Sequence, residues 1–260
     1  MSRIIFDLDG TLYEDERVHQ RYAEDLAATL PEGRSREFLR HWRRARAGEG
    51  VLAVGLGYDE GRDQLFRFRE DRVTHRLLWS GEEIPSDEPG PLFGPYHFIG
   101  DWWQLLKDLA AHHGISLEQN NAAFRATREW MSKAGFPLRS EPGLDAKLAK
   151  LGQQHDLVAM SNSPRASVED VLAQLGVERC FQEVVPDAAK PAGLVDYLAR
   201  TGAADVVSIG DHYINDIEPA LRAGARTIYI DRHGTRLGEE SGNCRLVGSI
   251  PEAWEVLLED

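Results

Sequence analysis

The chain has 260 residues, enough to bury a substantial core in one large domain or two modest ones. Its formal net charge of −13 argues against a nucleic-acid duplex as a partner, because such partners select a strongly basic surface. The sequence has no apolar run of bilayer length, no secretory leader and only two cysteines, which together favour a protein of the reducing cytoplasm that does not bind membranes.

The chain opens with an apolar segment that ends in two carboxylates. Residues 3–8 predict a buried strand, and Asp7 and Asp9 stand two positions apart at its carboxyl end. Because strand side chains alternate between faces, both carboxylates can lie on one side, and Gly10 permits a sharp turn after them. One carboxylate can then attack phosphorus while the other transfers a proton. The alternative interpretation is an ordinary polar Asp-Gly turn.

Residues 15–139 are dominated by helical periodicity. Apolar side chains recur on one helical face in three stretches, which begin at Val18, Trp102 and Leu117. Residues 84–100 are rich in proline and glycine and are expected to form a long loop. We therefore expect a mostly α-helical domain, inserted between the first strand and the rest of its sheet.

From residue 140 onward, strands alternate with helices. Strands are predicted at 156–160, 181–185, 205–209, 226–230 and 245–247. The helix after the first of these is expected to have Ser163 as its N-cap and Pro164 at its first position. The alternation predicts an α/β fold, a doubly wound, Rossmann-like parallel sheet built from residues 1–14 and 140–260. The inserted domain, 15–139, follows the two carboxylates directly and is expected to cover them as a cap.

Three further polar groups follow predicted strands: Ser161-Asn162, Lys190, and the acids Asp211 and Asp216. In open α/β sheets, ligands bind at the carboxyl ends of the strands, so we expect all these groups at one edge. Carboxylates suit Mg²⁺, a serine hydroxyl and helix N-terminal amides suit phosphoryl oxygens, and a lysine neutralises charge. Each group alone has an ordinary explanation as a cap, a solvated lysine or a turn. Four groups in this order favour phosphoryl transfer.

The four motifs, in this order, resemble those of the haloacid dehalogenase-like (HAD) hydrolase superfamily. The resemblance implies that Asp7 is the nucleophile and Asp9 the general acid and base. It implies that three residues bind the phosphoryl group: Ser161, Asn162 and Lys190. It also implies Mg²⁺ as the cofactor, with four ligands: Asp7, Asp9 through its backbone carbonyl, Asp211 and Asp216. The position of the insertion is similar to that of the family's first cap type, which is usually helical.

Asp9 also helps to separate the reactions of that superfamily. Members that dehalogenate carbon generally lack this second carboxylate. Its presence therefore favours a phosphatase, a phosphoric monoester hydrolase that acts on a small phosphorylated metabolite through an aspartyl-phosphate. A phosphomutase, which keeps both carboxylates, and a catalytically inert binding module are the alternatives. The sequence does not indicate the oligomeric state.

Two weaker signals lie elsewhere. Arg36, Arg40 and Arg43 share one helical face, which is either a recognition surface for a second anionic group or, more simply, a solvated face. The histidines have no metal-ligand spacing along the chain, so they predict no metal site.

Overall fold

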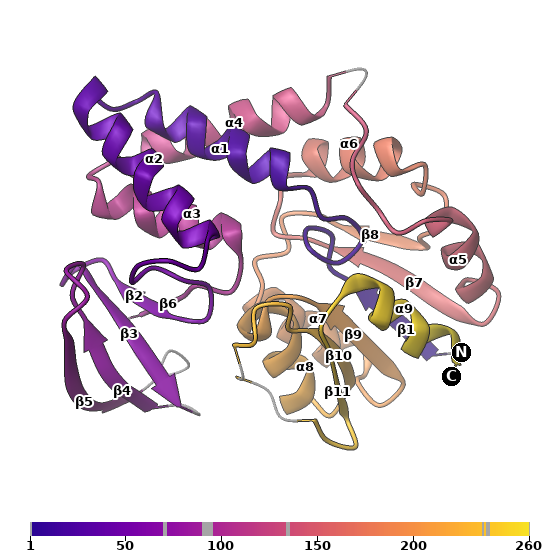
Figure 1. Ribbon diagram of the computed structural model, residues 1–260. Helices are drawn as coiled ribbons and strands as arrows, with labels where there is room; N and C mark the ends of the chain where they lie inside the picture. Colours follow the sequence, from indigo (N-terminus) through magenta and orange to yellow (C-terminus); the bar gives the residue numbers. More distant parts are fainter. Residues whose placement is uncertain are drawn as a thin grey trace. The chain divides into compact units, whose positions relative to one another are not determined.

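The computed structural model describes residues 2–69, 72–89, 96–133, 136–235, 237 and 240–259. The chain divides into two compact units (Figure 1). Residues Met1–Asp15 and Ser132–Asp260 form one, which we call the sheet unit, and Glu16–Met131 form the other, the inserted unit.

The sheet unit is built on a six-stranded sheet, counted over the described residues, in the order β11-β10-β9-β1-β7-β8. All neighbouring strands in it are parallel. The strands are β1 (Ser2–Phe6), β7 (His155–Met160), β8 (Glu183–Val185), β9 (Val206–Gly210), β10 (Arg226–Ile230) and β11 (Cys244–Val247). Strand β1, the first in the chain, lies between β7 and β9, so the inserted unit separates it from every strand it pairs with. The doubly wound parallel sheet predicted from the sequence is confirmed.

Helices cover both faces of this sheet. They are α5 (Leu144–Leu151), α6 (Arg165–Leu175), α7 (Ala192–Thr201), a π-helical turn (Tyr213–Ile217) that leads into α8 (Glu218–Arg222), and α9 (Ile250–Glu259). On one face, Ile5 of β1 packs in a cluster with Leu194 of α7 and Ala220 of α8. On the other, Phe6 stacks on Trp254 of α9, with ring centroids 5.8 Å apart. The alternation of strand side chains thus gives β1 one apolar contact layer on each side.

Helix α6 begins one residue later than the sequence predicts. Pro164 occupies the N-cap position, and the prediction of Ser163 as the N-cap is wrong. The backbone N–H of Arg165 instead donates to the carboxylate of Asp187, at 3.2 Å. A side chain from a distant loop therefore caps the helix, and spacing within the helix segment does not reveal it.

The inserted unit contains helices and, in addition, a sheet that the sequence analysis did not anticipate. The helices are α1 (Glu16–Ala27), α2 (Glu32–Arg46), α3 (Trp102–His112) and α4 (Leu117–Met131), which include the three predicted helical stretches. The sheet is antiparallel in the order β5-β4-β3-β2-β6. Its strands are β2 (Gly57–Asp59), β3 (Gln64–Arg69), β4 (Arg72–Leu77), β5 (Glu83–Pro89) and β6 (His97–Phe98).

The predicted loop at 84–100 is therefore wrong where β5 and β6 lie, while its residues 90–95 fall outside the described part of the chain. β5 pairs with β4 at one edge of the sheet and contains Pro85 and Pro89. An edge strand tolerates proline, because its outer N–H groups have no partner strand. Its side chains alternate between exposed and partly exposed, so the segment has no apolar pattern from which to recognise a strand.

None of the helices among the described residues combines the length and the apolar content needed to cross a bilayer.

Candidate active site

Asp7, the residue directly after β1, is the first residue of the candidate site along the chain. Its backbone N–H donates to the carbonyl of Ile209 in the neighbouring β9, at 2.9 Å, which fixes it where the two strands end. Three residues on, Gly10 has a φ of 77°, and a Cβ placed there would lie 2.0 Å from the Oδ2 of Asp211. Only glycine fits this turn without moving the Asp211 carboxylate, so the backbone of the loop after β1 lies directly against the side chain of Asp211.

Lys190 brings two carboxylates together. Its Nζ lies 2.7 Å from the Oδ1 of Asp7 and 2.5 Å from the Oδ1 of Asp216, and it donates to the carbonyl of Met160 at 3.1 Å. The Lys190 side chain is only 4% exposed. The chain thus holds an ammonium group and at least two carboxylates in a buried position, at the ends of strands that are far apart in sequence.

Burial and charge act in opposite directions in this group. Burial raises the pKa of Asp7 to about 7, although the ammonium of Lys190 acts to lower it. The nearby carboxylates of Asp216 and Asp9 reinforce the increase. Burial alone would lower the pKa of Lys190, but the carboxylates of Asp216 and Asp7 outweigh it and hold this pKa above its usual range. One ammonium therefore offsets only part of the carboxylate charge, and the site favours a further cation.

A third carboxylate completes the set. The side chains of Asp7, Asp211 and Asp216 each offer an oxygen, and these oxygens lie within 4.8 Å of one another. The carboxylate of Asp216 also accepts a hydrogen bond from the backbone N–H of His212 at 3.3 Å. The backbone carbonyl of Asp216 accepts one from the hydroxyl of Ser208 at 2.8 Å. We call Asp7, Asp211, Asp216 and Lys190 the carboxylate–lysine cluster. Three oxygens at this separation are a donor set that a hard cation such as Mg²⁺ prefers.

Ser161 and Asn162 follow β7 at the same edge of the sheet. The hydroxyl oxygen of Ser161 accepts the N–H of Ser163 at 3.1 Å, a bond that leaves its own proton available to a ligand. The Asn162 side chain holds the backbone of Lys190 at both ends, accepting its N–H at 2.6 Å and donating to its carbonyl at 3.2 Å. Asn162 thus orients the lysine, a contact that the sequence analysis did not anticipate.

Tyr13 was missed by the sequence analysis. Its hydroxyl donates to the Oδ1 of Asp9, and its ring is buried, with 2% exposure. The loop closes on itself through a second bond, from the N–H of Gly10 to the carbonyl of Tyr13 at 2.8 Å. The buried phenol of Tyr13 therefore orients the Asp9 carboxylate. No sequence signal predicts this contact, since tyrosine at this position also fits a core residue.

Arg232 is the second residue that the sequence analysis missed. It follows β10, and its guanidinium donates to the carbonyl of Gly10, lies 2.9 Å from Glu14 and lies 3.8 Å from the Oδ2 of Asp211. It therefore links the loop after β1 to the acid after β9. A signal existed here, because Arg232 stands at the carboxyl end of a predicted strand, as the other site residues do.

Comparisons with known proteins identify the family of the chain. The sequence profile of the haloacid dehalogenase-like hydrolase family matches residues 1–224. No curated protein matches the chain.

Several solved structures resemble the chain along almost its whole length. The putative HAD-hydrolase YfnB from Bacillus subtilis, described as bound to magnesium, has a TM-score of 0.55 at 14% identity, with 99% of each chain covered. A HAD phosphatase from Thermococcus onnurineus has a TM-score of 0.50 at 17% identity, covering 99% of this chain and 98% of its own. An L-2-haloacid dehalogenase from Xanthobacter autotrophicus has a TM-score of 0.51 at 16% identity, with the same coverage. At these identities the likeness shows the fold alone.

Proposed function

The chain belongs to the haloacid dehalogenase-like hydrolases, and from that premise we propose that it is a Mg²⁺-dependent phosphatase of small phosphate monoesters. The comparisons include both phosphatases and dehalogenases, so the choice between them rests on the site itself.

The observation that carries the proposal is the second carboxylate, Asp9. Cleavage of a phosphate ester needs a proton for the leaving oxygen and later a base for the attacking water. Release of a halide needs no such proton, because halides are stable anions. Asp9 stands two residues beyond Asp7, and its carboxylate is held by the buried hydroxyl of Tyr13. An oriented carboxyl group at this point supports phosphoryl chemistry.

In the proposed reaction, an oxygen of Asp7 attacks phosphorus, and the bond from phosphorus to the ester oxygen breaks. Asp9 gives its proton to that oxygen, which leaves as an alcohol. The product is an aspartyl-phosphate on Asp7. Asp9, now a base, takes a proton from water as the water attacks phosphorus and the bond from phosphorus to the Asp7 oxygen breaks, which releases phosphate and restores the Asp7 carboxylate and the protonated Asp9. Lys190, 2.7 Å from Asp7, opposes the effect of burial on the pKa of the attacking carboxyl group and offsets charge near the phosphoryl group.

The phosphoryl oxygens need donors, and Ser161 is the one we propose, through the hydroxyl proton that its bond with Ser163 does not use. We assign Asn162 to the same group because it fixes the position of Lys190 through two hydrogen bonds to that residue's backbone. This arrangement supplies what phosphoryl transfer requires, namely positioning and charge stabilisation.

The cluster also fits the metal that the family resemblance implies. The carboxylate oxygens of Asp7, Asp211 and Asp216 lie within 4.8 Å of one another, and the backbone carbonyl of Asp9 is the further ligand that the resemblance suggests. When bound there, Mg²⁺ would supply positive charge against the charge that develops on the phosphoryl oxygens.

We further propose a cytoplasmic location and a small phosphorylated metabolite as the partner. The two cysteines of the chain, Cys180 and Cys244, are both unpaired thiols, which suits a reducing compartment.

The test is a measurement of phosphate release from a panel of phosphomonoesters, with Mg²⁺ and with EDTA, alongside chloride release from 2-chloroacids. We expect phosphate release that depends on Mg²⁺ and no chloride release. Chloride release without phosphate release would contradict the proposal. Transfer of phosphate to a second hydroxyl of the substrate, without free phosphate, would identify a phosphomutase instead.

A further inference from the structure

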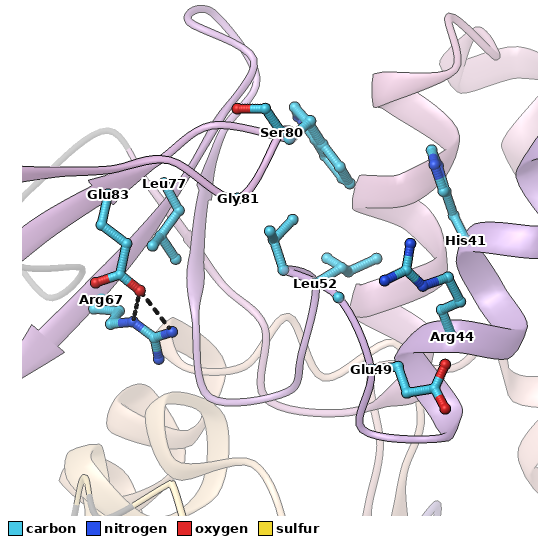
Figure 2. A pocket seen from close by; sticks show the side chains of 12 residues that line it. His41, Arg44, Glu49, Leu52, Arg67, Leu77, Ser80, Gly81 and Glu83 are labelled. Carbon is cyan, nitrogen blue, oxygen red and sulfur yellow. Dashed lines mark hydrogen bonds and ion pairs between the residues drawn. The ribbon is translucent and has the colours of Figure 1, made fainter.

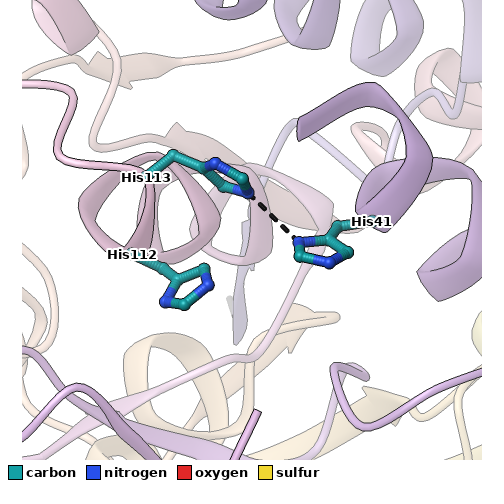
Figure 3. Close-up of side chains that lie close together, drawn as sticks. All are labelled: His41, His112 and His113. Atoms are coloured by element: carbon teal, nitrogen blue, oxygen red, sulfur yellow. Dashed lines mark hydrogen bonds between the residues drawn. The ribbon is translucent and has the colours of Figure 1, made fainter. Parts of the chain in front are cut away.

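Three histidines meet in the inserted unit, in a group that the proposed reaction does not use. His41 lies on α2, His112 is the last residue of α3, and His113 follows it (Figure 3). Each offers a ring nitrogen, and these nitrogens lie within 4.8 Å of one another. The Nδ1 of His41 and the Nε2 of His113 are 3.1 Å apart. Two nitrogens on one tetrahedral Zn²⁺ would stand about 3.3 Å apart, given metal–nitrogen bonds of about 2.0–2.1 Å.

A carboxylate orients the third imidazole. The Nδ1 of His112 lies 2.9 Å and 3.0 Å from the two carboxylate oxygens of Asp63. A carboxylate only accepts hydrogen bonds, so Nδ1 is the donor in this contact and Nε2 is the nitrogen left to face a metal. Metal-binding histidines in proteins usually carry such a carboxylate on the nitrogen that does not bind the metal, because it fixes the ring and raises its basicity.

Aromatic neighbours hold the rings in place. The indole of Trp79 stacks on His112 with centroids 3.6 Å apart and planes 16° apart. Phe38 and His113 form a T-shaped pair, with centroids 5.3 Å apart, and His113 is only 5% exposed. Rings that are fixed before a metal binds lose little conformational freedom when it does.

The same surroundings favour the neutral form of two of the imidazoles, those of His41 and His113. Burial, together with the neighbouring rings, lowers the pKa of His113 to about 4 and also lowers the pKa of His41. Neutral imidazole is the form that coordinates metal.

Packing alone explains only part of this arrangement. Two neutral imidazoles 3.1 Å apart share one hydrogen bond and need no other partner. That pair does not account for a third imidazole beside it whose orientation is set by a bidentate carboxylate. A divalent cation accounts for all three rings and for the carboxylate.

We propose that His41, His112 and His113 bind Zn²⁺, with Asp63 positioning His112. Three imidazoles suit zinc far better than Mg²⁺, which prefers oxygen ligands, so this site and the carboxylate–lysine cluster would select different metals.

A cavity of about 360 Å³ borders the three histidines, with His41 and Trp79 in its wall (Figure 2). A zinc ion held by three protein ligands would keep a fourth position for water or a small anion. Arg44, which lines the same cavity, would favour an anion there.

The experiment uses the full chain, stripped with a chelator and then saturated with Mg²⁺ so that the carboxylates are occupied. Zn²⁺ is titrated by calorimetry, and the thermal unfolding midpoint is followed. We expect one equivalent of Zn²⁺ to bind and to raise the midpoint by at least about 4 °C. His41→Gln should bind Zn²⁺ at least about 10-fold more weakly, and Asp63→Asn should lose about 10- to 100-fold. His75→Ala, a change at a histidine of β4 outside the cluster, should bind as the unchanged protein does.

A second measurement needs no variant of a buried residue. In the unchanged protein labelled with ¹⁵N-histidine, Zn²⁺ should shift the imidazole nitrogen resonances of three of the nine histidines, with His41 assigned through His41→Gln. If no imidazole resonance moves, or if His41→Gln binds Zn²⁺ as tightly as the unchanged protein, the three rings are packing residues and the proposal is wrong.

Discussion

The charges of the carboxylate–lysine cluster in the sheet unit and those of helix α2 in the inserted unit are organised in opposite ways. In the carboxylate–lysine cluster, Lys190 is 4% exposed, and its carboxylate partners come from the ends of different strands. On helix α2, Arg36 and Arg40 are 75% and 62% exposed, and each pairs with a glutamate one turn away on the same helix. Arg43 donates to the carbonyl of Leu39, also on that helix.

The difference indicates which charged groups affect stability and turnover when they are removed. A buried ion pair stabilises little by itself, but removing one partner leaves the other without water or counter-charge. Exposed pairs along a helix are solvated and screened by salt, so that losing them changes little. We therefore expect turnover and stability to depend on the carboxylate–lysine cluster and hardly on the arginines of α2. The arrangement of these arginines favours their interpretation as a solvated face.

The largest effect should come from Asp7→Asn. The amide has nearly the shape of the carboxylate, but it is a poor nucleophile and a weaker metal ligand. Turnover of any phosphomonoester should fall at least ~10³-fold, while the circular dichroism spectrum stays the same. Substantial activity in freshly prepared protein, shown by mass spectrometry to be free of deamidation, would falsify the role of Asp7 as nucleophile.

Asp9→Asn should come next. It removes the proposed proton donor, worth roughly 10²–10⁴-fold for alkyl phosphates. Aryl phosphates leave without a proton, so their loss should be clearly smaller. The measurement is kcat for one alkyl and one aryl substrate at saturating Mg²⁺. An equal loss for both substrates would exclude Asp9 as the general acid.

Lys190→Met should affect stability as well as turnover. It leaves Asp7 and Asp216 buried side by side without the ammonium between them, which costs about 3–5 kcal/mol. The free energy of unfolding should be measured by urea denaturation in EDTA, with Lys150→Met, an exposed lysine of α5, as the matched control. If both variants are destabilised equally, the buried ion pairs have no special importance.

The smallest effect should come from changing Arg36, Arg40 and Arg43 together to glutamine. Each of these side chains bonds only within α2 in the contacts described above, so we expect kcat and KM to change less than about twofold and the unfolding midpoint to move by less than about 2 °C. The kinetics should be measured with a doubly anionic phosphomonoester and with a small aryl phosphate. A rise in KM for the doubly anionic substrate alone would reverse this interpretation and make the arginines a recognition surface.

The sequence predicted the sheet and its polar edge for one physical reason. Parallel strands all end at the same edge, so recognising each strand also located the residue that follows it. Asp7, Ser161, Asp211 and Asp216 were predicted at that edge in this way. Lys190 was found ahead of a helix in the same pattern.

What the sequence did not reveal depends on contacts between distant residues. His41 and His113 are 72 positions apart, and no periodicity connects them. Asp187 caps α6 across 22 positions. The edge strand β5 has proline in it and no buried side chains, so its pairing with β4, and not its composition, makes it a strand. Such features follow from the assembled fold and have no local signature.

The central place of β1 has a consequence for how the chain is made. β1 is hydrogen-bonded to β7, where Ser2 pairs with His155, and to β9, where Arg3 pairs with Val206. At roughly 5–20 residues per second, the ribosome needs on the order of ten to forty seconds to make the second partner. During that time β1 is not paired on both sides, while Glu16–Met131 emerges complete with a core of its own. We therefore expect the inserted unit to fold during synthesis and β1 to need chaperone protection until late. Nascent chains stalled before β9 emerges should show the inserted unit, but not β1, protected from protease.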